Sequence, residues 1–272
     1  MSGAEPAGAS GGPPAAAAAW ARLRACVRVQ EGWLCSPLPA GRGVCRTCRG
    51  PADPCFARCF QCDLHTSSAP GLLADAVVPV SYAVKGGRHA ANLWRYKSGR
   101  PEAGTAGSAL LALLLVFLRD HGRCVWQAAG SGPPTHVATV PSTRGRPGPH
   151  PLQALLGRCL RLPPAALAVT AACGAAAPPD PLEPEEREIR PGLFAADGRL
   201  DAARILLLDD TWTTGARAQS AAAAAKLAGA RSVAIVVLGR HLNPADIAGQ
   251  PFGRSAGCRV FRGGTCAVHT RQ

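Results

Sequence analysis

Two groups of residues have types and spacings that could do chemistry, and the first is an acidic pair. Asp209 and Asp210 follow a short apolar run and precede a turn rich in hydroxyl groups, Thr211 to Gly215. Adjacent carboxylates can accept hydrogen bonds from both hydroxyls of a cis-diol, or can bind a metal ion. Backbone N–H groups at the start of a helix bind phosphate. A ligand that carries both a diol and a phosphate, such as a ribose 5-phosphate, would suit the whole stretch.

The second group is a set of cysteines near the amino terminus. They form two C-x2-C pairs: Cys45, Cys48, Cys59 and Cys62. Two such pairs about ten residues apart are typical of a tetrahedral zinc site, and four thiolates would make that site structural rather than catalytic. A loop of unpaired thiols or a disulfide pair is the alternative. Cys35 and Cys55 are extra cysteines that could compete for the metal.

The elements on either side of the acidic pair must position it. Ile205 to Leu208 is a continuous apolar run and predicts a buried parallel strand. The Ala-rich stretch from Ala216 to Ala228 predicts a helix, which Gly229 would end. Ligands of open parallel sheets bind beyond the carboxyl ends of the strands, which is where the pair would lie. A solvated acidic pair before a capped helix is the structural alternative.

The stretch from Ile205 to Ala216 resembles the phosphoribosyl pyrophosphate (PRPP) motif of type I phosphoribosyltransferases. That motif consists of four apolar residues, two acidic residues, two variable residues, two Thr or Ser, a Gly and a small residue, and this chain matches it throughout. The resemblance implies that Asp209 and Asp210 hold the ribose hydroxyls, with Mg²⁺ bound together with PRPP. It also implies a set of residues that hold the 5-phosphate: Thr211, Thr213, Thr214, Gly215 and Ala216.

The order of motifs along the chain is similar to that of the competence protein F (ComF) family. A cysteine-rich module comes first, then the segment Arg95-Tyr96-Lys97, then the phosphoribosyl motif. The resemblance implies that Lys97 is the basic residue of the family's second motif and that it contacts pyrophosphate. A solvated basic loop is the alternative for this segment. The association of ComF-like proteins with DNA uptake leaves a nucleic acid or a competence-type protein open as a partner.

A pyrophosphate site is expected after a further predicted strand, His136 to Val140. In phosphoribosyltransferases the turn after the corresponding strand cradles pyrophosphate. Here that turn contains Ser142, Thr143 and Arg144, which could bind an anion through backbone N–H groups and a guanidinium. The Pro-rich segment 178–191 lies where these enzymes carry a mobile loop, with a plain surface loop as the alternative.

The alternation of predicted strands and helices indicates an α/β fold, in which a mainly parallel sheet is flanked by helices and a small zinc-knuckle module precedes it. The 272 residues divide into four segments. Residues 1–19 are a low-complexity tail expected to be disordered, and 20–69 are the zinc-binding module. Residues 70–242 are the phosphoribosyltransferase-like domain, and 243–272 are a carboxyl-terminal tail.

The net charge of +13 suits a polyanionic ligand or nucleic acid, although a GC-rich coding bias toward Arg explains it equally well. No signal peptide is visible. The most apolar run, Leu110 to Leu118, is shorter than the roughly 20 residues that span a bilayer, and it predicts a buried helix. We therefore expect a cytoplasmic protein that does not insert into membranes.

These expectations favour an enzyme that transfers ribosyl 5-phosphate from PRPP to a nitrogen acceptor and releases pyrophosphate. The sequence identifies neither the acceptor nor a general base. The alternative is a non-catalytic protein that binds PRPP or a nucleotide, while its zinc module contacts nucleic acid or a partner protein.

Overall fold

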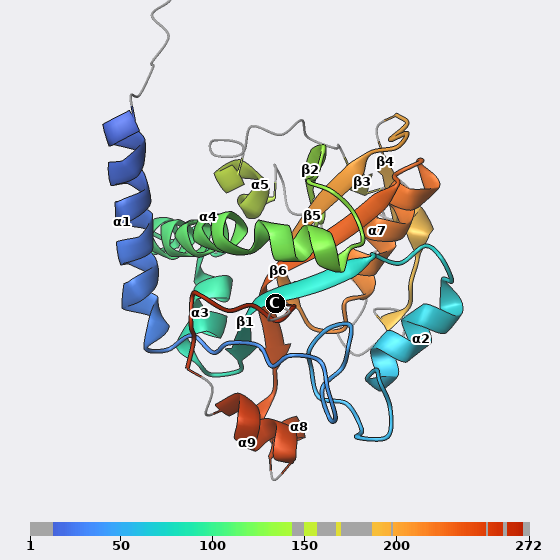
Figure 1. The fold of residues 1–272 in the computed structure, drawn as a ribbon, viewed down its shortest axis with the longest axis horizontal. Helices are drawn as coiled ribbons and strands as arrows, with labels where there is room; N and C mark the ends of the chain where they lie inside the picture. The colour runs from blue at the N-terminus through green and yellow to red at the C-terminus, as the bar shows by residue number, and fades with distance from the viewer. Residues whose placement is uncertain are drawn as a thin grey trace, which may run out of the picture.

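The fold was analysed in a computed structural model, which describes residues 13–142, 150–156, 167–169, 187–196, 198–248, 250–257 and 260–268. Within these ranges, strands in the order β1-β6-β5-β2 form a parallel sheet with helices on both faces (Figure 1). The strands of this sheet are β1 (Ala76–Val84), β2 (His136–Thr139), β5 (Arg204–Trp212) and β6 (Ser232–Leu242). The predicted α/β class with a parallel sheet is therefore confirmed.

The two inner strands are apolar on both faces. All four residues from Ile205 to Leu208 are buried in β5, as are Ser232 to Leu238 in β6. This is the pattern expected where helices cover both faces of a parallel sheet. Pro79 lies in β1, where its missing N–H is tolerated because β1 is at the edge of the sheet.

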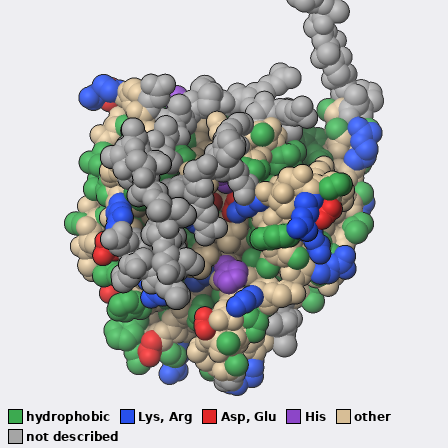
Figure 2. Space-filling view, turned by 180° about the vertical axis from the view of Figure 1, so that it is seen from behind, with side chains coloured by type: hydrophobic (Ala, Val, Ile, Leu, Met, Phe, Trp, Pro, Cys, Tyr) green, Lys and Arg blue, Asp and Glu red, His purple; other side chains and the backbone are tan. Residues whose placement is uncertain are grey.

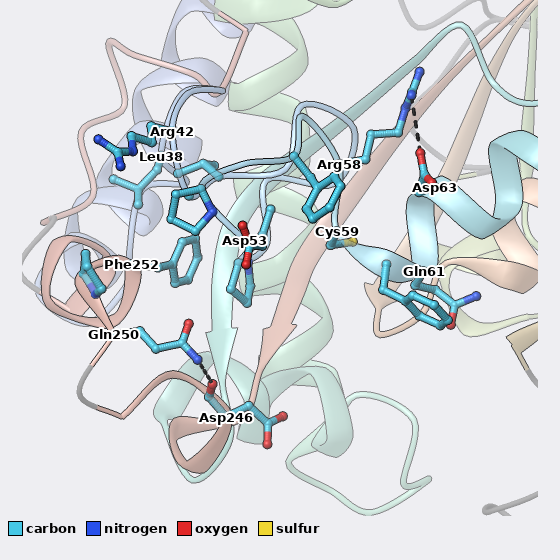
Figure 3. Close-up of a pocket in the computed structure, with 18 of the residues that line it drawn as sticks. Leu38, Arg42, Asp53, Arg58, Cys59, Gln61, Asp63, Asp246, Gln250 and Phe252 are labelled. Carbon is cyan, nitrogen blue, oxygen red and sulfur yellow. Dashed lines mark hydrogen bonds and ion pairs between the residues drawn. The ribbon is translucent and has the colours of Figure 1, made fainter.

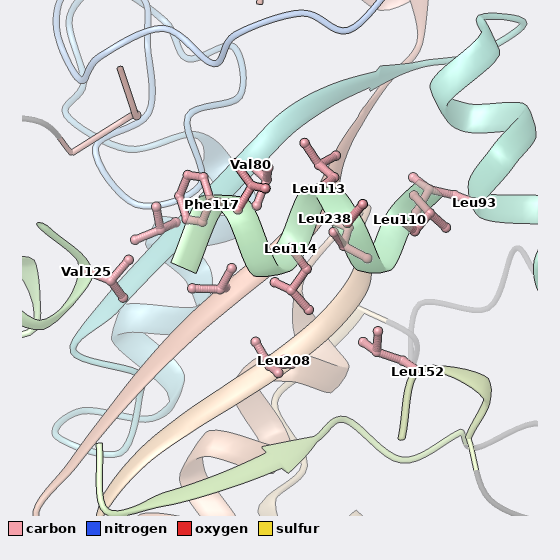
Figure 4. Close-up of a cluster of buried hydrophobic side chains, with 14 of the residues drawn as sticks. Val80, Leu93, Leu110, Leu113, Leu114, Phe117, Val125, Leu152, Leu208 and Leu238 are labelled. Carbon is pink, nitrogen blue, oxygen red and sulfur yellow. The ribbon is translucent and has the colours of Figure 1, made fainter. Parts of the chain in front are cut away.

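α4 (Ala103–Ala128) is the central helix on one face, and it contains the run predicted as a buried helix. Three other helices pack beside it: α1 (Pro13–Glu31), α3 (Arg88–Arg95) and α5 (Pro151–Leu156). Figure 4 shows Leu113 and Leu114 of α4 among Leu208 and Leu238 of the sheet. Burial of each such side chain stabilises the fold by about 1.5–3 kcal/mol. By length and composition alone α4 could also cross a membrane, but here it packs on β1 and β6.

α7 (Ala216–Leu227) covers the opposite face. Its residues Ala221 to Ala225 are almost completely buried, because small side chains let β5 and β6 approach the helix closely. The helix ends before Gly229, which adopts the left-handed φ of 104° that favours glycine. A short antiparallel pair and a 3₁₀ turn lie nearby: β3 (Leu167–Val169), β4 (Phe194–Ala196) and η2 (Pro191–Leu193). Of these, β4 and η2 pack on α7.

The cysteine-rich segment precedes α2 (Phe60–Ser68) and packs against the sheet rather than standing apart from it. Cys45 and Cys48 are buried in the same apolar cluster as Val77 of β1 and Ile205 of β5. The hydroxyl of Tyr82 on β1 donates to the Arg49 carbonyl at 2.7 Å. The cysteine-rich segment and the sheet therefore share one core.

The carboxyl-terminal segment is also part of the fold. It contains α8 (Pro244–Ile247) and α9 (Pro251–Gly257), and then residues 260–268, which return to the amino-terminal part of the chain. The backbone N–H of Phe261 donates to the Leu34 carbonyl at 3.2 Å, and Phe261 is buried in the α4 core. The described part of 243–272 is thus packed structure, rather than the tail predicted from its lack of motifs.

Two further boundaries differ from the sequence-based expectation. α1 begins at Pro13, within the segment predicted to be disordered, and residues 1–12 lie outside the described part. Continuation of the helix into the Ala-rich run agrees with the high helix propensity of alanine. β5 continues to Trp212, so Asp209 and Asp210 lie within the strand rather than beyond it. Pairing with β6 extends β5, because Asp209, Thr211 and Trp212 all have partners there.

Candidate functional site

The acidic pair lies near the carboxyl end of β5, where side chains alternate between the two faces of the sheet. Asp210 is buried, with 3% of its surface exposed, on the face covered by α3, α4 and α5. Asp209 is partly exposed, and one of its oxygens accepts a hydrogen bond from the Asp210 backbone N–H at 2.8 Å. The two carboxylates therefore have different surroundings.

Three side chains from other elements surround the Asp210 carboxylate. The hydroxyl of Tyr96, directly after α3, donates to Oδ2, and Nζ of Lys97 lies 2.6 Å from Oδ1. Nε2 of His150, just before α5, lies 3.4 Å from Oδ2. The structure thus brings Lys97 to the acidic pair, as the pyrophosphate prediction requires. The ammonium group has three donors, so contact with Asp210 leaves it able to bind an anion as well.

These surroundings shift the pKa values of the two carboxyl groups in opposite directions. Burial, together with the negative charge of Asp210, raises the pKa of Asp209 to about 7, although Lys97 and Arg217 act against this rise. Burial would also raise the pKa of Asp210. The charge of Lys97 and the hydrogen bonds from Lys97 and Tyr96 outweigh that effect, so the pKa of Asp210 lies below its ordinary value. Asp210 is therefore the firmly ionised member of the pair.

A recess of about 90 Å³ opens beside the acidic pair. Its polar lining includes Ser142 and Arg217 in addition to Lys97, His150 and the two carboxylates. Ser142 reaches this place because β2 pairs with β5 in parallel, so both strands end at the same edge of the sheet. Two other residues of the predicted pyrophosphate turn, Thr143 and Arg144, lie outside the described residues.

The predicted phosphate turn leads from β5 into α7. Gly215 has a left-handed φ of 84°, and a Cβ there would lie 2.0 Å from Cζ2 of Trp212, so this position requires glycine on two counts. The backbone N–H of Ala216 donates to Oγ1 of Thr214 at 3.4 Å. Because Arg217 on the first turn of α7 lines the recess, the phosphate turn lies next to the acidic pair.

Arg240, near the end of β6, donates hydrogen bonds to the backbone of this turn. Its Nη1 donates to the carbonyls of Trp212 at 3.2 Å and Thr213 at 3.1 Å. Burial would lower the pKa of Arg240, but nearby thiolates, Cys48 foremost, raise it. A Cβ on Gly50 would lie 2.4 Å from Nη2 of Arg240, so the guanidinium also fills the space beside the cysteine cluster.

The second predicted site is also assembled. The sulfur atoms of the two C-x2-C pairs, which are Cys45, Cys48, Cys59 and Cys62, all lie within 4.8 Å of one another. The Cys48 and Cys59 sulfurs are 3.8 Å apart, about the separation that Zn–S bonds of about 2.3 Å give in a tetrahedron. The backbone N–H of Gly50 donates to the Cys48 sulfur at 3.4 Å. The extra Cys35 is outside this group, as is the exposed Cys55.

The four thiols can ionise together only if a cation compensates them. Hydrogen bonds from the other three thiols hold the pKa of Cys45 far below its usual range. The same contacts raise the pKa values of Cys59 and Cys62 well above theirs. A divalent ion such as Zn²⁺ would remove this conflict, because it binds all four as thiolates. The donor set and its spacing therefore fit a zinc ion.

A cavity of about 1230 Å³ lies elsewhere in the described part of the chain (Figure 3). It lies between the cysteine-rich segment and α8–α9, where Leu38, Asp53 and Phe252 line one part and Arg58, turned toward Asp63, lines another. Arg187, in the predicted mobile loop, lines this cavity rather than the recess, and its carbonyl accepts a hydrogen bond from Gln61 at 2.7 Å. This larger cavity does not contain the acidic pair, so cavity volume alone does not identify the candidate site.

Sequence reasoning missed several residues of the acidic site. Tyr96 adjoins Lys97 in the basic segment, but nothing in the sequence indicates that its hydroxyl reaches Asp210. His150 lies in a Pro-rich stretch of the sequence and Arg217 on an Ala-rich helix, and neither forms part of a motif. The apolar run Arg231 to Leu238 is typical of a buried strand, and the place of Arg240 just beyond its carboxyl end is the signal that indicates this residue.

Comparisons of the chain with protein-family models, curated proteins and solved structures gave no match. The class that the fold and the sites define is an α/β protein with a parallel sheet and a Cys₄ cluster able to bind zinc.

Proposed function

We propose that this protein binds PRPP at the carboxyl edge of its parallel sheet, in the manner of a type I phosphoribosyltransferase of the ComF kind. One observation carries the proposal: residues predicted separately for ribose and for pyrophosphate meet at one recess. Lys97 and Ser142, far from the acidic pair in sequence, both line the recess beside Asp209 and Asp210. Such an edge is the usual ligand site of open α/β sheets.

The residues have separable roles in this proposal. The 5-phosphate would bind the backbone N–H groups of the turn, with the hydroxyls of Thr213 and Thr214 and the positive end of α7. Asp209, the more exposed carboxylate, would accept hydrogen bonds from the ribose hydroxyls. Asp210 would hold Lys97 toward the pyrophosphate, since its oxygens already accept hydrogen bonds from Tyr96 and Lys97.

The proposed reaction breaks the bond from ribose C1 to the pyrophosphate oxygen and forms a bond from C1 to a nitrogen acceptor. Pyrophosphate leaves with the electron pair, and the acceptor loses a proton. Mg²⁺ bound with PRPP would neutralise the leaving group, with Asp209 as the fitting oxygen ligand in this chain. The protein's own contribution would be positioning and charge compensation by Lys97, Arg217 and the phosphate turn.

The test is calorimetric titration of PRPP with Mg²⁺ into the wild-type protein and into the double variant Asp209→Asn with Asp210→Asn. We expect binding to weaken at least about 100-fold in the variant, which corresponds to roughly 2.8 kcal/mol. Asp201→Asn is the matched control, because Asp201 is exposed and pairs with Arg199 away from the recess. Unchanged affinity in the double variant would refute the assignment, provided that circular dichroism and zinc content show an intact fold.

Pyrophosphate release across a panel of bases and amines then separates an enzyme from a binding protein. Release with one acceptor would establish transfer, and binding without release would support a PRPP or nucleotide sensor. On the face shown in Figure 2, Lys and Arg side chains lie in several separate groups among apolar and acidic ones. Nucleic-acid binding remains a separate hypothesis, and loss of affinity with increasing salt would support it.

A further inference from the structure

A second group of metal-ligating side chains lies on the α4 face of the sheet. It consists of His121, Cys124 and Cys266, whose ligand atoms all lie within 4.8 Å of one another. His121 and Cys124 are three residues apart on α4, so they project from the same side of the helix. Cys266 belongs to the packed segment 260–268. None of these residues belongs to the Cys₄ cluster or to the recess.

The hydrogen bonding of His121 suits a metal ligand. Its Nε2 lies 2.7 Å from the Gly263 carbonyl oxygen, which can only accept, so Nε2 carries the proton. Nδ1, which is shielded from solvent, then carries the lone pair. Metal-binding histidines usually donate their second ring N–H to a carbonyl or carboxylate in this way. The Phe117 ring, 5.2 Å away between ring centroids, adds an apolar wall.

Charge balance also fits a divalent ion. Two thiolates and one neutral imidazole around a Zn²⁺ ion have no net charge, so the assembly can be partly buried at low electrostatic cost. Arg49 is close to this group, because its Nε donates to the carbonyl of Ala267 at 3.3 Å. Its guanidinium therefore adds a positive charge beside Cys266.

We propose that His121, Cys124 and Cys266 form a second zinc site, which fastens the segment 260–268 to α4. Zn–S bonds of about 2.3 Å and Zn–N bonds of about 2.1 Å place such ligand atoms about 3.5–3.8 Å apart, so small side-chain adjustments would suffice. Thiolate and imidazole ligands select Zn²⁺ over Mg²⁺ or Ca²⁺. The fourth position would be taken by water.

The test is the zinc content of the full-length protein, purified with a phosphine reductant and saturated with Zn²⁺ before desalting. We expect two zinc ions per chain, one for each group of ligands. Cys266→Ser and Cys124→Ser should each retain one zinc ion, the one bound by the Cys₄ cluster. Cys45→Ser should also retain one, because it loses the Cys₄ ion and keeps the ion at His121, Cys124 and Cys266. Cys55→Ser is the control and should retain both, because Cys55 is exposed and outside both groups.

A second measurement covers variants that fold poorly. In the wild-type protein, the rates at which Cys124 and Cys266 react with iodoacetamide should rise together when zinc is removed, and the rate for Cys26 should not follow them. One zinc ion per chain that Cys266→Ser keeps and Cys45→Ser loses would overturn the proposal. So would a disulfide-linked Cys124–Cys266 peptide, found by mass spectrometry in reductant-free protein without a second zinc ion.

Discussion

At the scale of single residues, the surroundings of Asp209 disfavour its ionised carboxylate at neutral pH. Its pKa is raised to about 7 by burial and by the charge of Asp210, whereas an Asp in an unfolded chain has a pKa of about 3.9. Between these values the folded protein holds a proton that the unfolded chain has lost. The Asp209 carboxyl therefore makes the folded state less stable as pH rises through this range. Strain of this kind is common where a site is prepared for a ligand.

We predict that Asp209→Asn stabilises the ligand-free protein, because asparagine cannot ionise. The gain over wild type should increase from about pH 4 to about pH 7 and then level off, with a slope of at most about 1.4 kcal/mol per pH unit. Partial exposure of the carboxylate should keep the slope below that limit. Urea unfolding at pH 5, 6, 7 and 8 measures it. A pH-independent difference would show that Asp209 titrates normally.

Asp210→Asn is the matched comparison, and it should change the stability of the fold in the opposite direction. The pKa of Asp210 is lowered by Lys97 and Tyr96, so its ionised form stabilises the fold above the ordinary pKa of Asp. That contribution is lost as pH falls toward the lowered pKa. The variant should therefore be less stable than wild type at pH 7, and the difference should shrink on acidification.

At the scale of elements, the end of β6 connects the two candidate sites. Arg240 reaches the carbonyls of the phosphate turn on one side and the thiolates of the Cys₄ cluster on the other. Gly239 makes this path possible, because a Cβ there would lie 2.4 Å from Cδ1 of Leu93. The strand can thus run close under α3 and still place Arg240 beneath the turn.

We predict that Arg240→Gln loosens the phosphate turn and leaves the Cys₄ site loaded. It removes two hydrogen bonds from a charged donor, each worth about 1.5–3 kcal/mol. Amide hydrogen exchange in residues 211–217 should become faster, and PRPP affinity should fall about tenfold or more, while one zinc ion stays on the Cys₄ cluster. Arg231→Gln, an exposed position at the start of β6, is the control. Unchanged exchange in the turn would exclude this role for Arg240.

The elements also show what the sequence could and could not predict. The run Ile205 to Leu208 predicted a buried strand because continuous apolar residues suit a sheet covered on both faces. Its extension to Trp212 was not predictable, because the two Asp residues are of a type depleted in strands and only pairing with β6 supplies the partners. The Cys₄ group was predictable because regular spacing of identical ligands is a local signal.

Contacts between distant segments were beyond the sequence. Tyr96 and His150 meet Asp210 only because α3 and α5 pack on the same face of the sheet. Cys266 meets His121 because an unremarkable carboxyl-terminal segment returns to α4. No periodicity or spacing encodes these approaches. They follow from tertiary packing, and Asp210 illustrates the consequence: the sequence predicts a ligand-binding carboxylate, and packing adds its contact with Lys97.

At the scale of the whole molecule, the Cys₄ cluster is part of the main core rather than a separate module. Cys45, Cys48 and Cys62 are buried in the same apolar cluster as Ile205 and Trp212 of β5. The Tyr82 hydroxyl adds two links, because it donates to the Arg49 carbonyl at 2.7 Å and accepts from the Leu38 N–H at 3.0 Å. Loss of the metal ion from the Cys₄ cluster should therefore destabilise the sheet as well.

We predict that Cys45→Ser with Cys48→Ser destabilises the sheet and α7 as well as the cysteine-rich segment. The two remaining thiols cannot hold a tetrahedral ion, and the free energy of binding a structural zinc ion, about 10–16 kcal/mol in small peptides, contributes directly to folding. Hydrogen exchange should accelerate in β5 and α7 along with residues 35–68, and thermal unfolding should remain one transition at lower temperature. Cys55→Ser should leave both unchanged. Acceleration confined to residues 35–68, with β5 and α7 protected as in wild type, would mean that the segment folds independently and that its contacts with Trp212 and Arg240 do not couple the two sites.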